Sequence, residues 1–167
     1  MEFGVDAQWV LDPTLLLTHK DYEALGPNIQ DPNVNSAMPY VLDDNVEKDE
    51  LAQKIANDKG LRVLRANGRV EDTSAPIEEK IQPPVENWLG DFVSSSYVIT
   101  DSFHACVFSI LFHRQFTVIA NKERGYARFS SLLKLFGLEL EVIASPSVYK
   151  PLSVFDCSFV VESLEIQ

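Results

Sequence analysis

The sequence predicts an α/β fold, a Rossmann-like three-layer domain with a mostly parallel sheet. Short apolar runs typical of buried strands alternate along the chain with segments of helical periodicity. The segments between the expected strands are about 10–15 residues long, as crossovers between parallel strands require. At 167 residues the chain has the length of one ordinary domain. We therefore expect a single domain over residues 1–167.

Capping and turn residues divide the first part of the chain into elements. Thr18 is a suitable N-cap, and Gly26-Pro27 would end the helix that follows it. Asp44 and Glu47 have the spacing of a capping box, and Gly60 predicts the end of that helix. The predicted elements are a strand over Ala7–Leu11, a helix from Thr18 to Leu25, a loop over residues 27–37, a strand over Tyr40–Leu42, a helix from Asp44 to Asp58 and a strand over Leu61–Leu64.

The rest of the chain continues the alternation after a polar connector over residues 66–83. Pro83-Pro84 predicts a helix start, and Thr100-Asp101-Ser102 offers three potential N-caps for a nearly all-apolar helix. The other predicted elements are a helix over Val85–Val93, strands over Tyr97–Ile99 and Phe116–Ala120, a loop over Asn121–Ala127, a helix over Arg128–Phe136 ended by Gly137, and a strand over Leu140–Ile143. Residues 144–167 are expected to begin a terminal helix region.

Composition excludes several classes of function. The chain has 14 Lys and Arg against 25 Asp and Glu, a net charge of −11. This charge argues against binding to nucleic acid or to anionic lipid, since both need a basic surface. The apolar runs are too short to span a bilayer, and the first residues lack the features of a signal peptide. We expect a cytoplasmic protein in which Cys106 and Cys157 are buried thiols.

The turn from Tyr97 to His104 is the first candidate site. Ligands of parallel sheets bind beyond the carboxyl ends of the strands, where helix N-termini present free N–H groups. With Asp101 and Ser102 as caps, His104 lies on the first helical turn, where the positive helix end favours the neutral imidazole. This arrangement suits a general acid or base. From position alone, a structural histidine bonded to a neighbouring loop is the commoner case.

The next strand-to-helix turn, Ala120–Arg128, should open on the same sheet edge. Arg124 and Arg128 lie four residues apart there, and their guanidinium groups suit a phosphate or a carboxylate. Residues 102–138 hold five basic residues and one acidic residue, in a chain that is otherwise acidic. The pattern indicates a small anionic ligand or, equally on charge alone, a solvated helix face. We expect no metal site.

Three segments resemble one known family. They are WVLDPTLLLTHKDYEAL, VITDSFHACVFSILFHRQF and NKERGYARFSSLLKLFGLE. They are similar to the mid-chain and C-terminal parts of the polysaccharide pyruvyl transferases. The resemblance implies one half of a two-Rossmann-domain (GT-B-type) architecture. It also implies transfer of pyruvyl from phosphoenolpyruvate to a sugar of a surface polysaccharide, with formation of a ketal and without a further cofactor.

The resemblance also assigns site residues. His104 matches the family's catalytic histidine, at the start of the same helix. Some members carry an arginine two residues earlier, where this chain has Ser102, so we expect other groups to hold the anionic donor. The expected substrate-binding residues are Asp101, Ser102, Phe103, Asn121, Arg124 and Arg128.

A full-length member carries an N-terminal domain of comparable size. We therefore expect this chain to be the C-terminal, donor-side half of a longer enzyme, inactive alone, with a terminal helix region cut short. Its face toward the missing domain would be apolar and would favour self-association. Two alternatives stay open, a nucleotide-sugar glycosyltransferase domain and a non-catalytic interaction domain.

Overall fold

The computed structural model describes residues 10–25, 35–64, 66, 76–77, 81–119, 126–138 and 142–143. Five strands form one sheet of order β2-β1-β3-β4-β5, and every neighbouring pair is parallel. The strands are β1 (Ser36–Tyr40), β2 (Arg62–Val63), β3 (Tyr97–Thr100), β4 (Gln115–Ile119) and β5 (Val142–Ile143). The predicted α/β class with a parallel sheet is confirmed. The likeness to half of a GT-B enzyme stays a prediction.

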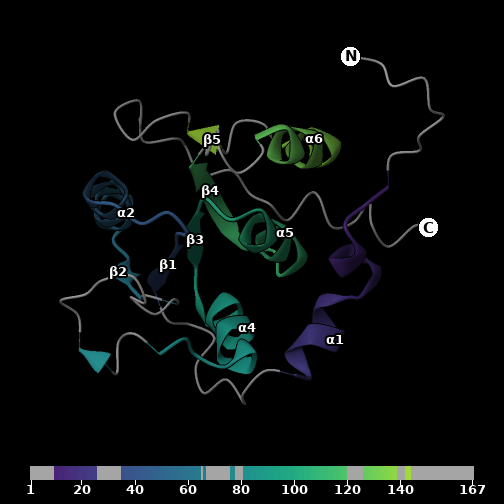
Figure 1. The fold of residues 1–167 in the computed structure, drawn as a ribbon, viewed down its shortest axis with the longest axis horizontal. Coiled ribbons are helices and arrows are strands. Elements are labelled where there is room, and N and C mark those ends of the chain that lie inside the picture. Colours follow the sequence, from purple (N-terminus) through teal and green to yellow (C-terminus); the bar gives the residue numbers. More distant parts are fainter. Residues whose placement is uncertain are drawn as a thin grey trace.

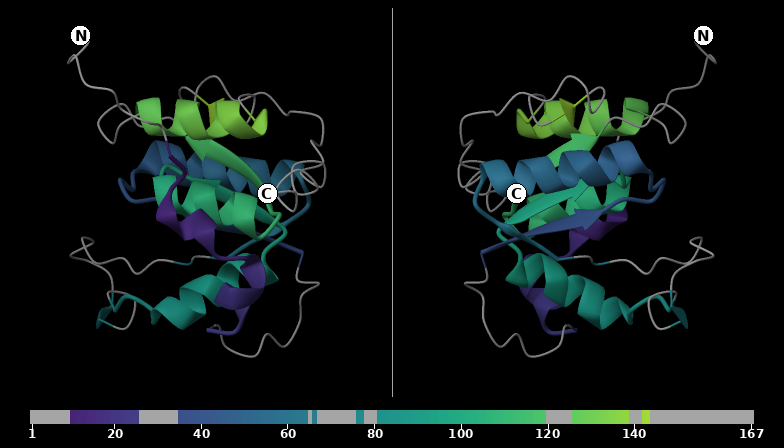
Figure 2. Two further views of the ribbon diagram at one scale, coloured as in Figure 1. Left: turned by 90° about the vertical axis from the view of Figure 1, so that its right-hand side faces the viewer. Right: turned by 90° about the vertical axis from the view of Figure 1, so that its left-hand side faces the viewer.

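Helices cover both faces of the sheet (Figure 1). Helix α2 (Val46–Asp58) packs on one face, and α4 (Val85–Ser94), α5 (Phe103–Leu111) and α6 (Tyr126–Phe136) pack on the other. A short 3₁₀ helix, η1 (Pro13–Leu16), contacts α5, and α1 (His19–Glu23) contacts α4. Figure 2 shows this N-terminal segment lying across the outer side of α4 and α5. None of the described helices is long and apolar enough to cross a membrane.

Alternate side chains of the strands belong to two hydrophobic cores, one on each face of the sheet. In β3, Val98 belongs to the core under α4, α5 and α6, whereas Tyr97 and Ile99 belong to the core under α2. Because the strands are buried on both faces, they read in sequence as continuous apolar runs rather than as alternating ones. Cys106 is fully buried in the first core, as expected, and Cys157 lies outside the described residues.

Three helices end in the same left-handed cap. Gly60 after α2 and Gly137 after α6 have φ of 66° and 68°, and both were predicted helix ends. After α5 the same position holds His113, with φ of 56°. The N–H of Arg114 donates to the carbonyl of Ser109 over 2.8 Å, which completes a Schellman motif there. A non-glycine residue in this conformation costs about 1 kcal/mol.

Strand β1 begins four residues earlier than predicted and ends two residues earlier, so it includes residues 36–37 of the predicted loop. It also contains Pro39, a residue that sequence rules confine to edge strands. The Ala37 carbonyl accepts a hydrogen bond from the Leu64 N–H, so residue 37 faces β2. Pro39, two residues further on, faces the same side, but β2 pairs only with Ser36 and Ala37. The missing N–H of Pro39 therefore loses no sheet hydrogen bond.

Other boundaries also differ from the predictions. Val10 and Leu11, the described part of the first predicted strand, form no strand and lead into η1. The N-cap of α2 is Asn45, whose side chain accepts from the Lys48 N–H, and not Asp44. Helix α6 begins at Tyr126, two residues before its predicted start. The loop over residues 27–34, most of the connector over residues 66–83 and residues 144–167 lie outside the described part of the chain.

Candidate functional site

The candidate site lies at the carboxyl ends of β3 and β4. Thr100, the last residue of β3, pairs with Val118 of β4, so both strands end at one edge. Helix α5 starts directly after β3 and carries His104 in its first turn. Arg128 lies in the first turn of α6, and its positive charge and that of His104 both lower the pKa of the same carboxyl group, that of Asp12. The prediction that the two turns share an edge is confirmed for His104 and Arg128.

Hydrogen bonds fix the turn that precedes α5. Of the three potential caps, Ser102 is the N-cap, and its Oγ accepts a hydrogen bond from the Ala105 N–H over 3.4 Å. The N–H of Ser102 donates to Oγ1 of Thr100 over 2.9 Å, and that hydroxyl donates to the Tyr40 carbonyl over 2.6 Å. His104 therefore projects from a well-ordered turn, with 62% of its side chain exposed.

Asp101 has a different task from the predicted one. It does not cap α5, and its side chain is fully buried. Its carboxylate accepts the N–H groups of Leu42 and Asp43 over 2.7 and 3.2 Å and forms a 2.8 Å ion pair with Lys48 of α2. With these three donors on its two oxygens, Asp101 joins the end of β1, the start of α2 and the turn before α5. Asp101 therefore anchors the turn that carries His104.

Asp12 is a site residue that sequence reasoning missed. It is the N-cap of η1, and its Oδ1 accepts a hydrogen bond from the Thr14 N–H over 2.9 Å. Its Oδ2 lies 3.9 Å from Nε2 of His104. Partial burial alone would raise the pKa of Asp12. The hydrogen bonds from Thr14 and the positive charges of His104 and Arg128 outweigh that effect, and the pKa lies below its usual value.

Nothing in the sequence alone pointed to Asp12. Asp12-Pro13 has the composition of a turn, and it directly follows the strand predicted over Ala7–Leu11. Its relation to His104 arises only when η1 packs against α5, across more than ninety residues of chain.

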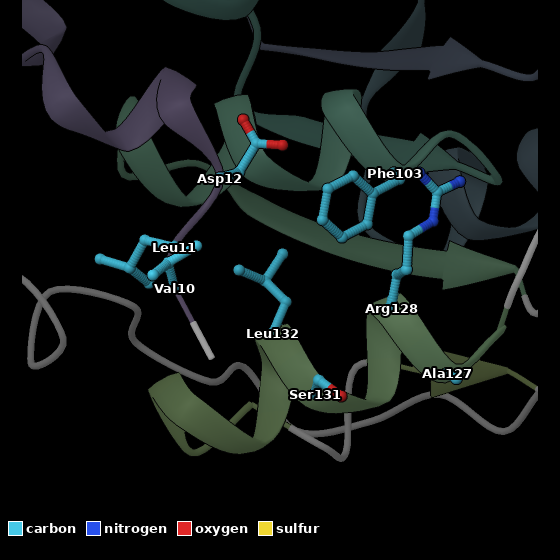
Figure 3. Close-up of a pocket in the computed structure, with 8 residues that line it drawn as sticks. All are labelled: Val10, Leu11, Asp12, Phe103, Ala127, Arg128, Ser131 and Leu132. Atoms are coloured by element: carbon cyan, nitrogen blue, oxygen red, sulfur yellow. The ribbon is translucent and has the colours of Figure 1, made fainter. Parts of the chain in front are cut away.

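A pocket of about 390 Å³ opens beside these residues (Figure 3). The guanidinium group of Arg128 lies over the Phe103 ring, 4.9 Å from its centre, which is a cation–π contact. The residues that line the pocket combine apolar side chains with charged and polar ones: Val10, Leu11, Asp12, Phe103, Ala127, Arg128, Ser131 and Leu132. A cationic group beside an apolar wall suits a small anion that also has a non-polar part.

Two predicted site residues, Asn121 and Arg124, lie outside the described residues, so their roles stay predictions. Among the residues that the structure does describe, no three His, Cys, Asp or Glu side chains gather as a metal ion would require.

Large apolar side chains are exposed along the segment that borders the pocket. They are Val10, Leu11, Leu16, Leu17 and Leu25. The predicted contact with a further domain, or with a second copy of the chain, stays a prediction.

The comparison with protein families identifies the chain. The family model for polysaccharide pyruvyl transferases matches residues 1–123, a span that includes Asp12, Phe103 and His104. Neither the curated proteins nor the solved structures gave a match. The match covers most of the chain, and its family is the one that the three sequence segments resemble. The chain belongs to the polysaccharide pyruvyl transferase family.

Proposed function

We propose that this chain forms the donor-side domain of an enzyme that transfers pyruvyl from phosphoenolpyruvate to a sugar of a surface polysaccharide, forming a ketal. Family membership supports the class of transfer. The observation that carries the donor assignment is the grouping of His104, Asp12 and Arg128 beside a pocket of about 390 Å³. An exposed histidine supplies a titrating group next to a cation that attracts an anionic donor.

The chemistry assigned to these groups is acid-catalysed addition to the enol. Protonated His104 gives its proton to the methylene carbon of phosphoenolpyruvate, which leaves an oxocarbenium-like carbon bonded to the phosphate oxygen. A sugar hydroxyl adds to that carbon and returns a proton to His104. The carbon–oxygen bond to phosphate then breaks, and phosphate leaves with the electron pair. A second sugar hydroxyl closes the ketal, and its proton passes to the departing phosphate.

The anionic parts of the donor need partners that balance their charge. Arg128 provides one cation, and the free N–H groups at the start of α5 add a partial positive charge beside His104. The Arg128 guanidinium group lies over the Phe103 ring, and this cation–π contact supports the Arg128 side chain. Ser102, Asn121 and Arg124 are proposed as further contacts to the donor, and Asp101 acts only through the turn that it anchors.

Substitution of His104 by Asn tests the proposal in the full-length protein. Asn keeps a polar group of similar size but removes the titrating one. General acid–base catalysis supplies about 10²–10⁴-fold, so phosphate release from phosphoenolpyruvate in the presence of acceptor should fall by at least about 10²-fold. The melting temperature should change little, since most of the His104 side chain is exposed.

His19→Asn is the matched control, since His19 lies in α1 and away from the pocket lining. Its turnover should stay near the wild-type value. Intact turnover in His104→Asn would remove His104 from the mechanism. Release of nucleotide from a nucleotide sugar, without turnover of phosphoenolpyruvate, would instead establish the glycosyltransferase alternative.

A further inference from the structure

We propose that Asp12 is the positioning residue for His104: its carboxylate, which lines the pocket, faces the imidazole and holds the ring beside the pocket. The inference rests on the proposed function for the catalytic step that it supports. The contact between the two residues is a separate observation and can be tested without catalysis.

The geometry is that of a partly solvated ion pair. Oδ2 of Asp12 lies 3.9 Å from Nε2 of His104, which is within ion-pair range but longer than a hydrogen bond. Only 18% of the Asp12 side chain is exposed, against 62% for His104. The carboxylate is therefore the buried member of the pair, and the imidazole is the solvent-exposed one. Such catalytic contacts often shorten when the substrate binds.

The orientation of Asp12 is set without His104. Its Oδ1 is held by the Thr14 N–H, and Pro13 occupies the first position of η1. The hydroxyl of Tyr22 donates to the Thr14 carbonyl over 3.0 Å, and the Tyr22 ring packs edge-on against Phe108 of α5. These contacts join η1 to the helix that carries His104. Oδ2 is left to face the imidazole, as a preorganised site requires.

Two cationic side chains act on Asp12 among the residues that the structure describes. The positive charges of His104 and of Arg128 both lower the pKa of the Asp12 carboxyl, and the effect of Arg128 is the smaller one. An anionic donor bound to Arg128 would occupy that guanidinium group and leave the carboxylate to His104. The imidazole would then be held most firmly when the donor is in place.

Asp12→Asn tests the inference, because the amide oxygen still accepts the Thr14 N–H while the charge is lost. At 3.9 Å in a largely aqueous setting the lost attraction corresponds to about a fivefold loss in the population of the oriented imidazole. We expect kcat with phosphoenolpyruvate to fall by up to about fivefold, with KM changed less than twofold.

Asp21→Asn is the matched control. Asp21 is also a capping carboxylate of the N-terminal segment, but it accepts hydrogen bonds from Thr18 and lies near His19 rather than His104. This variant should keep the wild-type kcat. A purely structural role for Asp12 would lower the melting temperature of Asp12→Asn, whereas the positioning role lowers kcat at an unchanged melting temperature.

A second readout requires no activity. Coupling is reciprocal, so His104→Asn should raise the pKa of the Asp12 carboxyl, measured by carbon NMR titration. If that pKa rises while phosphoenolpyruvate is not turned over, the pairing stands and only the proposed reaction fails. If phosphoenolpyruvate is turned over, but Asp12→Asn keeps the wild-type kcat and His104→Asn leaves the Asp12 pKa unchanged, the positioning role is overturned.

Discussion

Replacing Asp101 with alanine should destabilise the domain by about 3–5 kcal/mol, the usual cost of breaking a buried ion pair from one side. The side chain is fully buried, and its loss leaves the N–H groups of Leu42 and Asp43 without their acceptor. The Lys48 ammonium loses its carboxylate partner and keeps only its 2.7 Å hydrogen bond to the Asp43 carbonyl among the contacts described. A domain of this size is typically stable by about 5–15 kcal/mol. The substitution should therefore remove a large part of the total stability.

A double-mutant cycle separates the ion pair from the backbone contacts. Asp101→Asn keeps an acceptor for one backbone N–H, whereas Lys48→Met removes the ammonium and keeps its alkyl chain. Each single change leaves one member of the pair uncompensated in a buried place. The double variant has no unpaired charge, so it should cost about 1–3 kcal/mol less than the sum of the single changes. Urea unfolding followed by tryptophan fluorescence gives each free energy.

Glu50→Ala provides the control, because Glu50 is an exposed carboxylate on the same helix as Lys48. It should change the free energy of unfolding by less than about 0.5 kcal/mol. A loss below about 1 kcal/mol in Asp101→Ala would refute the anchoring role. Strict additivity in the cycle would refute the contribution of the ion pair.

Two further predictions concern stability. Tyr22→Phe removes the hydrogen bond to the Thr14 carbonyl and should lower the free energy of unfolding by about 1 kcal/mol; an unchanged urea midpoint would contradict this. Burial raises the pKa of Asp91 to about 6, so the native state disfavours its ionised form at neutral pH. Asp91→Asn should therefore raise the free energy of unfolding by about 1 kcal/mol at pH 7, a value already reduced because the side chain is partly exposed. This gain in stability should disappear as the pH falls from about 6 to below about 4, since the carboxyl is then protonated in both the folded and the unfolded state. A gain that persists at pH 3.5 in urea unfolding would show another cause.

Local chemistry predicted most of the fold. Helix ends at Gly60 and Gly137, the helix start after Pro84 and the buried strand from Tyr97 follow from caps, turns and apolar runs that act within a few residues. The position of β1 depends instead on its neighbours. Pro39 fits a central strand only because β2 is too short to reach it, and no local pattern contains that information.

The candidate site divides in the same way. His104 and Arg128 were predicted because parallel strands bring successive strand-to-helix turns to one edge. Asp12 could not be predicted, since its relation to His104 depends on how η1 packs against α5. Asp101 was correctly predicted at the carboxyl end of β3, but the prediction that it caps α5 was wrong. A carboxylate before a helix is typical of a cap, and only the tertiary structure brings Lys48 and the end of β1 to it.

Anchoring and chemistry are assigned to different residues of one short turn. Asp101 is buried and accepts hydrogen bonds on both oxygens, whereas His104, three residues later, is mostly exposed and lies 3.9 Å from the carboxylate of Asp12. A fully buried carboxylate cannot contact a substrate, and a mostly exposed imidazole contributes little to the core. Changes at Asp101 should therefore lower stability and activity together. The Asn variants of His104 and of Asp12 should lower activity alone, since the amide at residue 12 still caps η1. The ratio of the two losses therefore reports which task a residue performs.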